Sequence, residues 1–310
     1  MTPTLRVEEP GLLTTVQDLG RPNAISSGVP AGGAMDRFAH SAANLLVGND
    51  PGRATLECTF GGLHLVAEDT CLVAVTGADF DLHVNGALAP AWTGIFLAAG
   101  DRLAFGATRT GARAYIAVAG GVEADRWLGS LSTNLMAARG GFRGRALESG
   151  DIVSTSGEPR RPAVSGHHLA EQLRPMYGDH TLLTIAGPHA KRLHPESRAL
   201  LFESTYKVSR DSDRMGYRLE GRKLTVSGED LLSFGLVAGA VQVPPSGQPI
   251  LLMADHQTAG GYPVVATVVS ASLPIAAQLL PGDDVRFAEV KVERANQMRR
   301  ALESALDSLR

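Results

Sequence analysis

The 310-residue sequence has few cysteines and few lysines, and these shortages exclude several kinds of protein. Its two cysteines, Cys58 and Cys71, lie in separate apolar runs and lack metal-ligand spacing. Thiols in such runs are usually buried and reduced, so we predict neither a disulfide nor a metal centre. The net charge of −3 does not favour binding to nucleic acid or to an anionic membrane.

Several motifs that identify enzyme classes are absent from the chain. No lysine follows a glycine, which excludes the Gly-x-x-x-x-Gly-Lys phosphate loop, and no two glycines are separated by one residue, which excludes Gly-x-Gly-x-x-Gly. The His-Glu-x-x-His and Gly-x-Ser-x-Gly motifs are missing, as is the Met-Lys-Met loop that usually carries biotin. We therefore expect no metal, no biotin attached to this chain and no self-sufficient ATP site.

The chain also lacks long apolar runs. None approaches the roughly 18 residues that a membrane-spanning helix needs. The first ten residues include Arg6, Glu8 and Glu9, so they do not form the apolar core of a signal peptide. We therefore expect a cytoplasmic protein.

Glycine and proline, in contrast, are plentiful, with 35 and 17 residues. They separate short runs rich in β-forming residues, and Asn85-Gly86 is a strong hairpin signal. We predict a mainly β fold, either a barrel or a sandwich. The expected strands are 71–75, 81–86, 114–119, 182–186, 224–227, 240–243, 250–254 and 264–269.

Helical spacing is limited to a few segments. We expect helices over 35–47, just before Pro281, and over Val292–Leu309, where apolar residues recur every three or four positions. The polar, Pro-containing stretch 154–162 lies near the midpoint of the chain and is the predicted linker. The predicted domains are therefore 1–155 and 163–310.

The polar segment Gln242–Pro263 is the richest source of candidate site residues. Two polar loops flank an apolar run, and loops at the end of a rigid sheet are where sites usually form. Paired glycines in the second loop allow backbone N–H groups to approach a ligand closely. The alternative is that these side chains only satisfy the backbone of their own turns. The candidates are Gln242, Ser246, Gln248, Asp255, Gln257, Thr258, Gly260, Gly261 and Tyr262.

Further candidates lie outside this segment. An arginine in the polar run 210–214 would bind a carboxylate through two parallel hydrogen bonds, or would pair with its acidic neighbours instead. Polar residues near position 20 would orient a substrate or hold a loop. The candidates of this second group are Gln17, Asp18, Arg21, His189, Arg210 and Arg214.

Several of these stretches carry a family resemblance. Gln242–Pro263 resembles the QxPPSGQPI…DxQTTGGYP signature of the family that contains the C subunit of 5-oxoprolinase, KipA and allophanate hydrolase subunit 2. Thr14–Pro22 is similar to the family's TTVQDLGRPG block, and Val208–Gly221 is similar to VSxxSDRMGxRLxG. The resemblance extends over about residues 5 to 290. Ala259 replaces a usual threonine and Leu131 a usual arginine.

The resemblance implies two cyclophilin-like β-barrel domains, with the C-terminal helix on the second. It also implies a subunit of an ATP-dependent amide hydrolase, which would convert 5-oxo-L-proline to L-glutamate. A KipI-like B subunit would be its partner, a third A subunit would take part, and ATP would bind at a site shared between subunits. In this reaction Asp255 would act as general base or charge stabiliser beside Gln257 and Gln242, and the other candidates would bind the substrate.

Two other functions remain open. The related domain of urea amidolyase works as a carboxyltransferase with biotin, so an allophanate or urea-type activity is one alternative, with biotin carried by another chain. The other alternative is a KipA-like regulatory protein that binds a kinase inhibitor. Neither alternative involves nucleic acid or a membrane.

Overall fold

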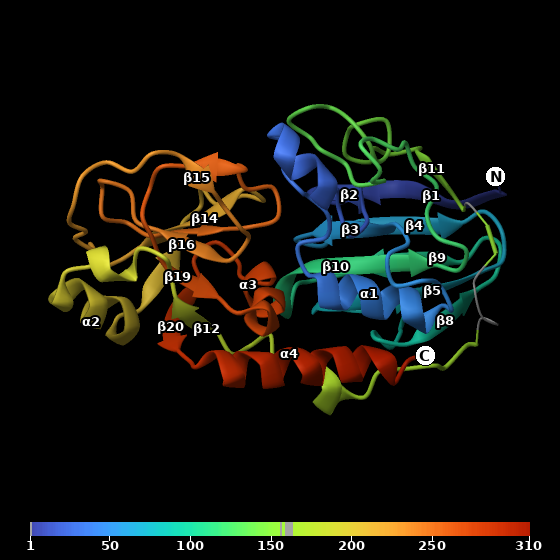
Figure 1. Cartoon of the computed structure of the whole chain (residues 1–310). Coiled ribbons are helices and arrows are strands. Elements are labelled where there is room, and N and C mark those ends of the chain that lie inside the picture. The colour runs from blue at the N-terminus through green and yellow to red at the C-terminus, as the bar shows by residue number, and fades with distance from the viewer. Residues whose placement is uncertain (1, 156, 159–163) are drawn as a thin grey trace. The chain divides into compact units, whose positions relative to one another are not determined.

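The computed structural model describes residues 2–155, 157–158 and 164–310. It divides into two compact units (Figure 1). Unit 1 consists of Met1–Arg21, Gly32–Pro175 and Leu302–Arg310, and unit 2 of Pro22–Ala31 and Met176–Ala301. Each unit is assembled from separated stretches of sequence. The domain bounds 1–155 and 163–310 stay a prediction, and residues 156 and 159–163, around the predicted linker, lie outside the described residues.

Unit 1 contains two antiparallel sheets (Figure 1). The six-stranded sheet has the order β11 (Ile152–Thr155), β1 (Thr2–Pro10), β4 (Leu63–Ala67), β9 (Arg102–Phe105), β6 (Leu82–Val84), β7 (Ala87–Leu88). The five-stranded sheet has the order β2 (Leu13–Gln17), β3 (Thr55–Thr59), β10 (Thr110–Val118), β5 (Cys71–Asp79), β8 (Gly94–Leu97). The mainly β prediction is confirmed, although unit 1 forms two sheets where the resemblance implied one barrel.

The core of unit 1 is built from the alternating apolar residues of these strands, including Leu5, Leu56, Leu65, Val75 and Ile116. Both predicted free thiols belong to it. Burial raises the pKa of the Cys58 and Cys71 thiols to about 11, so both remain protonated and unreactive near neutral pH.

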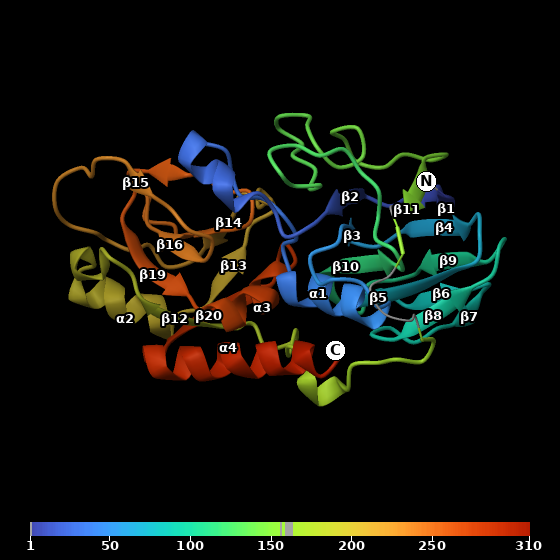
Figure 2. The ribbon, with the colours of Figure 1, turned by 45° about the vertical axis from the view of Figure 1, so that its right-hand side comes forward.

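Local signals explain where helix α1 (Arg37–Leu46) begins and ends. Asp36 caps it, because its carboxylate accepts a hydrogen bond of 2.9 Å from the N–H of Ala39. Gly48, with a φ of 77°, follows the last turn. The helix packs on β10 and β5, as Figure 2 shows from a second side. The helix expected over 35–47 is therefore confirmed.

Unit 2 is organised around a closed seven-stranded barrel. Its order is β12 (Thr181–Ala186), β19 (Val264–Val268), β16 (Ala240–Gln242), β17 (Ile250–Leu252), β14 (Gly216–Glu220), β13 (Tyr206–Val208), β20 (Asp284–Glu289). A separate two-stranded sheet pairs β15 (Phe234–Gly235) with β18 (Ala259–Gly260). The expected strand over 224–227 is wrong: this segment makes only an isolated bridge between Val226 and Leu193, because no longer strand lies beside it.

The remaining helices are short except the last. Helices α2 (Pro195–Glu203), which packs on β20, and α3 (Leu273–Ala277) belong to unit 2, and α4 covers Val292–Asp307, close to the predicted bounds. The 3-10 helices are Pro22–Ser27, Glu171–Leu173, Ala190–Arg192 and Ser270–Ser272. In the part of the chain that the structure describes, no helix has the length and apolar character needed to cross a membrane.

Candidate functional site

Two of the three candidate glutamines of unit 2, Gln242 and Gln257, meet beside a glycine. Gln242 ends β16 and is only 1% exposed, and its Nε2 donates a hydrogen bond of 3.3 Å to the carbonyl oxygen of Tyr262. A Cβ atom at Gly260 would lie 3.0 Å from Nε2 of Gln257 and 3.5 Å from Nε2 of Gln242. Both amide nitrogens therefore lie close to the backbone of Gly260, where a larger residue would displace them. The structure brings this part of the predicted site together.

Asp255, in contrast, is held by an arginine. Nε of Arg214 donates to Oδ2 of Asp255 at 2.7 Å, and Nη2 lies 3.4 Å from Oδ1. The side chains are only 10% and 18% exposed, so this charge-assisted pair is shielded from water. The backbone N–H of Asp255 also bonds to the carbonyl of Arg214 at 2.8 Å. Arg214 is therefore ion-paired, but with a distant candidate residue and not with the acidic neighbours in its own run.

Gln248 bonds to the backbone of Gly221 and to the side chain of Ser246. The side-chain amide of Gln248 accepts from the N–H of Gly221 at 3.0 Å and donates to the carbonyl of Gly221 at 3.1 Å. The backbone N–H of Gln248 lies 3.4 Å from Oγ of Ser246. The amide of Gln248 thus binds the backbone of a distant segment and not that of its own turn, and it links the two segments. Arg210 is exposed and makes no hydrogen bond or ion pair within the described ranges.

His189 lies at the start of the 3-10 helix Ala190–Arg192 in unit 2. Its Nδ1 accepts a hydrogen bond of 3.2 Å from the N–H of Val264, and its ring centroid lies 4.8 Å from that of Phe234. Burial, together with the nearby charge of Arg192, lowers the pKa of His189. The imidazole is therefore neutral near pH 7 and packs as an aromatic group.

Thr258 is bonded through its backbone: its carbonyl oxygen accepts a hydrogen bond of 3.0 Å from the N–H of Leu236.

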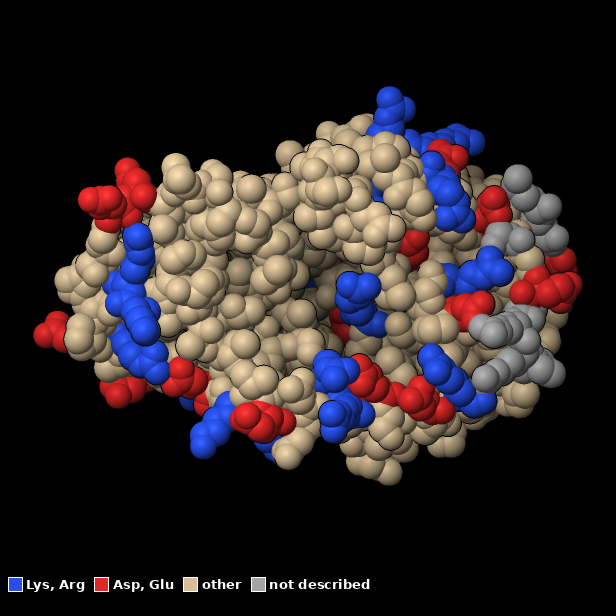
Figure 3. Space-filling model, in the orientation of Figure 1, with Lys and Arg blue, Asp and Glu red and all other residues tan. Residues whose placement is uncertain are grey.

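A hollow of about 540 Å³ opens beside the second signature loop of unit 2. Part of its lining comes from predicted site residues, since Gly261 and Tyr262 contribute to it. The other part, Arg192 and the loop 226–231, is not predictable from the sequence, because nothing local connects residue 192 to residue 228. Figure 3 shows that Lys and Arg side chains gather along one edge of unit 2, while much of the face in view is uncharged. The remaining lining residues are Val243, Pro245 and Pro263.

The unit 1 candidates form a buried hydrogen-bond network. The carboxylate of Asp18 accepts from the N–H of Gly20 at 2.7 Å, and from Oγ of Ser130, Oγ of Ser132 and the N–H of Leu131, each at 2.6 Å. All four donors to the carboxylate are groups of the protein. Asp18 therefore ties the loop 130–132 to the end of β2, as the alternative interpretation expected.

Arg21 and Gln17 reinforce the same loop. The Arg21 guanidinium donates to the carbonyl of Ser132 and lies 4.9 Å above the ring of Trp127, a cation–π distance. Nε2 of Gln17 donates to Oγ1 of Thr15 at 3.0 Å and to the carbonyl of Thr133 at 3.4 Å. The Leu131 side chain, where the family usually has arginine, packs against the hydrophobic core.

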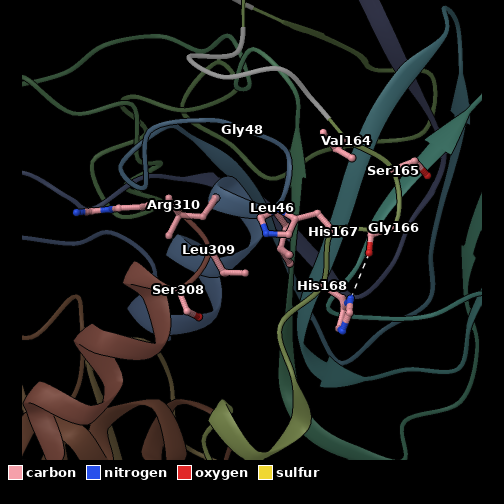
Figure 4. Close-up of a pocket in the computed structure, with 11 residues that line it drawn as sticks. Leu46, Gly48, Val164, Ser165, Gly166, His167, His168, Ser308, Leu309 and Arg310 are labelled. Carbon is pink, nitrogen blue, oxygen red and sulfur yellow. Dashed lines mark hydrogen bonds between the residues drawn. The ribbon is translucent and has the colours of Figure 1, made fainter.

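A second hollow, of about 730 Å³, lies within unit 1 (Figure 4). Leu46 and Leu309 provide apolar walls, and Nδ1 of His168 lies 3.2 Å from the carbonyl oxygen of Gly166. Figure 4 shows the Arg310 side chain extending away from His168, so the polar groups do not converge. The described residues contain no cluster of three His, Cys, Asp or Glu side chains suited to a metal ion.

Comparison with known proteins identifies the family. The model of the carboxyltransferase domain, subdomain A and B, matches residues 27–289. The chain is 37% identical to the 5-oxoprolinase C subunit of Escherichia coli (strain K12), over 95% of this chain and 94% of that protein. It is 30% identical to the urea amidolyase of Lachancea kluyveri, over 98% of this chain but 18% of that protein.

A solved structure gives the same result. The crystal structure of the Kluyveromyces lactis urea carboxylase matches with a TM-score of 0.93 and 28% identity, over 99% of this chain and 29% of that one. The chain therefore belongs to the carboxyltransferase domain family that includes the C subunits of 5-oxoprolinase and one region of the urea amidolyases.

Proposed function

We propose that this chain is the C-type subunit of an ATP-dependent hydrolase that opens 5-oxo-L-proline to L-glutamate, together with a KipI-like B subunit and an A subunit. The observation that carries the proposal is the extent of the likeness. The chain is 37% identical to a 5-oxoprolinase C subunit over 95% of its length, and 30% identical to a urea amidolyase over 98% of its length. The higher identity favours the 5-oxoprolinase subunit as the counterpart.

The chemistry of the reaction explains why ATP is needed. A lactam carbonyl is a poor electrophile, because resonance with nitrogen stabilises it. In the proposed reaction its oxygen attacks the γ-phosphorus of ATP, and ADP leaves. Water then adds to the carbonyl carbon, the ring C–N bond breaks as nitrogen takes a proton, and a second water hydrolyses the acyl phosphate to carboxylate and phosphate. ATP itself would bind at a site shared with a partner subunit.

The paired glutamines supply the polar groups of the proposed site. Each amide nitrogen carries two N–H groups, and Gln242 uses only one in its bond to Tyr262. The amides of Gln242 and Gln257 would donate hydrogen bonds to the oxygen that water adds to the carbonyl carbon, as this oxygen gains negative charge in the tetrahedral intermediate. The adjacent backbone of Gly260 and Gly261 lets a ligand approach closely. The Asp255 carboxylate is already ion-paired with Arg214, so in the proposed site it would stabilise charge and would not act as the general base.

Reconstitution with the partner subunits tests this function. The complete set of subunits should release glutamate and ADP in equal amounts from 5-oxo-L-proline and ATP. Gln257→Ala should lower kcat by about 100-fold, as expected when one donor to a developing oxyanion is removed. Gln297→Ala, at an exposed glutamine of α4, should leave kcat unchanged. The absence of glutamate with all three subunits present would refute the proposal.

A carboxyltransferase activity is the second candidate, because the matched family model and the urea carboxylase structure both describe such a domain. Biotin would then be carried by another chain, since no lysine of this sequence lies beside a methionine. Turnover of urea or allophanate that avidin blocks would favour this function. Avidin-resistant, ATP-dependent lactam hydrolysis would favour the first.

A further inference from the structure

An arginine at the hollow of unit 2 is fastened to the loop that forms one wall. Nη1 of Arg192 donates a hydrogen bond of 2.6 Å to the carbonyl oxygen of Glu229. The carbonyl of Arg192 in turn accepts from the N–H of Ser227 at 2.8 Å and from its hydroxyl at 3.2 Å. These contacts link the 3-10 helix Ala190–Arg192 to the loop 226–231. The guanidinium is therefore held at the hollow by both its side chain and its backbone.

The charge of this arginine is not neutralised by a carboxylate. Within the described residues, the bond to Glu229 is the only hydrogen bond of its side chain, and it forms no ion pair. A guanidinium has five N–H donors, so most of them remain available to a ligand. Arg198, by comparison, is occupied by both carboxylate oxygens of Glu289, and Arg214 by Asp255. Arg192 thus differs from these two arginines of the same unit.

The acidic residues of the loop do not cancel this charge. Glu229 and Asp230 both line the hollow, but both are exposed, so water and salt screen their carboxylates. A ligand anion in direct contact with Arg192 would form short charge-assisted bonds that such screening weakens much less.

A glycine keeps the guanidinium in place. Gly228 has a φ of 97°, a conformation that favours glycine, and a Cβ atom there would lie 3.2 Å from both Cζ and Nη1 of Arg192. A side chain at residue 228 would therefore strain the loop and push the arginine from its position. The close approach of loop and guanidinium depends on this residue.

The walls of the hollow indicate the kind of ligand. Val243, Pro245 and Pro263 offer apolar surface to a small ring, and Tyr262 adds a phenol that is 44% exposed as a residue. Gly261 lines the hollow and directly follows Gly260, beside which the two glutamine amides meet. Gln242 and Gln257 do not line the hollow themselves, so a ring seated here would meet the apolar walls and Arg192, which would bind an anionic substituent.

We propose that Arg192 binds the carboxylate of a small cyclic amide and so determines which lactams this chain accepts. The inference rests on the proposed function and deepens it, because 5-oxoproline carries one carboxylate and 2-pyrrolidone is the same ring without it. The loss of a hydrogen bond to a charged group weakens binding by about 10- to 100-fold. Arg192 would therefore act on the KM for the lactam and leave kcat nearly unchanged.

Kinetics of the reconstituted complex test this specificity. Arg192→Gln should raise the KM for 5-oxo-L-proline by about 10- to 100-fold, while the low activity toward 2-pyrrolidone stays unchanged. Arg192→Lys, which keeps the charge and a donor for the Glu229 carbonyl, should lose less. Arg198→Gln, at an arginine already occupied by Glu289, should match the unmodified protein. Thermal unfolding of each variant shows whether the fold is retained.

Three outcomes separate the inference from the function on which it rests. Glutamate production with an unchanged KM in Arg192→Gln overturns the inference and leaves the function standing. A raised KM for ATP alone also overturns it, because the arginine would then contact phosphate. If no glutamate forms at all, calorimetric titration of 5-oxo-L-proline into the complex decides: binding that Arg192→Gln abolishes supports the carboxylate site, and the absence of such an effect refutes it.

Discussion

At the scale of single residues, the buried carboxylate of Asp18 has a structural role that its sequence position does not reveal. The residue pattern makes Asp18 a candidate substrate ligand, and the structure shows both of its oxygens bonded to the protein. A sequence gives the residue type but not the partners, which lie more than 110 positions away in the loop 130–132. The convergence of Gln242 and Gln257 is predictable in outline because their segments flank one strand. The position of Arg192 is not, because its partner loop is distant in sequence.

Replacing Asp18 by asparagine should therefore lower stability. Asp18→Asn keeps the shape but removes the charge that strengthens four hydrogen bonds, and we expect a loss of about 2 to 4 kcal/mol in the free energy of unfolding. Urea denaturation measures the change. Asp125→Asn, at an exposed aspartate a few residues before the loop 130–132, should change the free energy of unfolding by less than about 0.5 kcal/mol. Equal effects in the two variants would contradict the role given to Asp18.

His40 should make stability depend on pH. It is fully buried beside Thr55, and burial lowers its pKa from 6.5 to about 4. Because the pKa is lower in the folded state, the unfolded chain binds the proton first, so stability is complete above pH 6.5 and is lost as pH falls to about 4. The full loss is about 3 kcal/mol. Urea denaturation between pH 7 and 4 should show this slope, and His40→Gln should flatten it; an unchanged slope would exclude His40 as its source.

At the scale of elements, the sequence predicts helix ends and tight turns well, but it does not predict which strands pair with one another. Asp36 and Gly48 bound α1, the heptad-like spacing of α4 gives its extent, and Asn85-Gly86 forms the turn between β6 and β7. The segment 224–227 has strand-like composition but no strand beside it, a condition that only the tertiary structure reveals. The division of unit 1 into two sheets likewise depends on contacts between distant segments.

The β6–β7 turn allows a clean test of glycine at a required conformation. Gly86 has a φ of 81°, and no atom lies within 4 Å of a Cβ built there, so Gly86→Ala should cost only the backbone strain, about 1 kcal/mol. Gly178→Ala is the matched control, since its surroundings are equally open and its φ is not in the left-handed region. Thermal unfolding compares them, and an equal change in both would show that the turn conformation is not responsible.

At the scale of the whole molecule, no described part of the chain supplies a recognisable nucleotide motif, so we expect activity only in a complex. This chain alone, with ATP and 5-oxo-L-proline, should release no glutamate above background, and addition of the B and A subunits should start the reaction. A coupled assay for glutamate measures both. Full activity of the isolated chain would show that its ATP site is self-contained.

The order in which the ribosome delivers the chain has a consequence for assembly. Unit 1 includes residues 302–310, with Leu309 buried, yet these follow all of unit 2 in sequence. Residues 22–31 emerge early but belong to unit 2, whose other residues start at 176. The core residues of unit 1 all lie between Leu5 and Val153, so a nascent chain can assemble this core before unit 2 is made, and residues 302–310 can join unit 1 only after unit 2 has been synthesised.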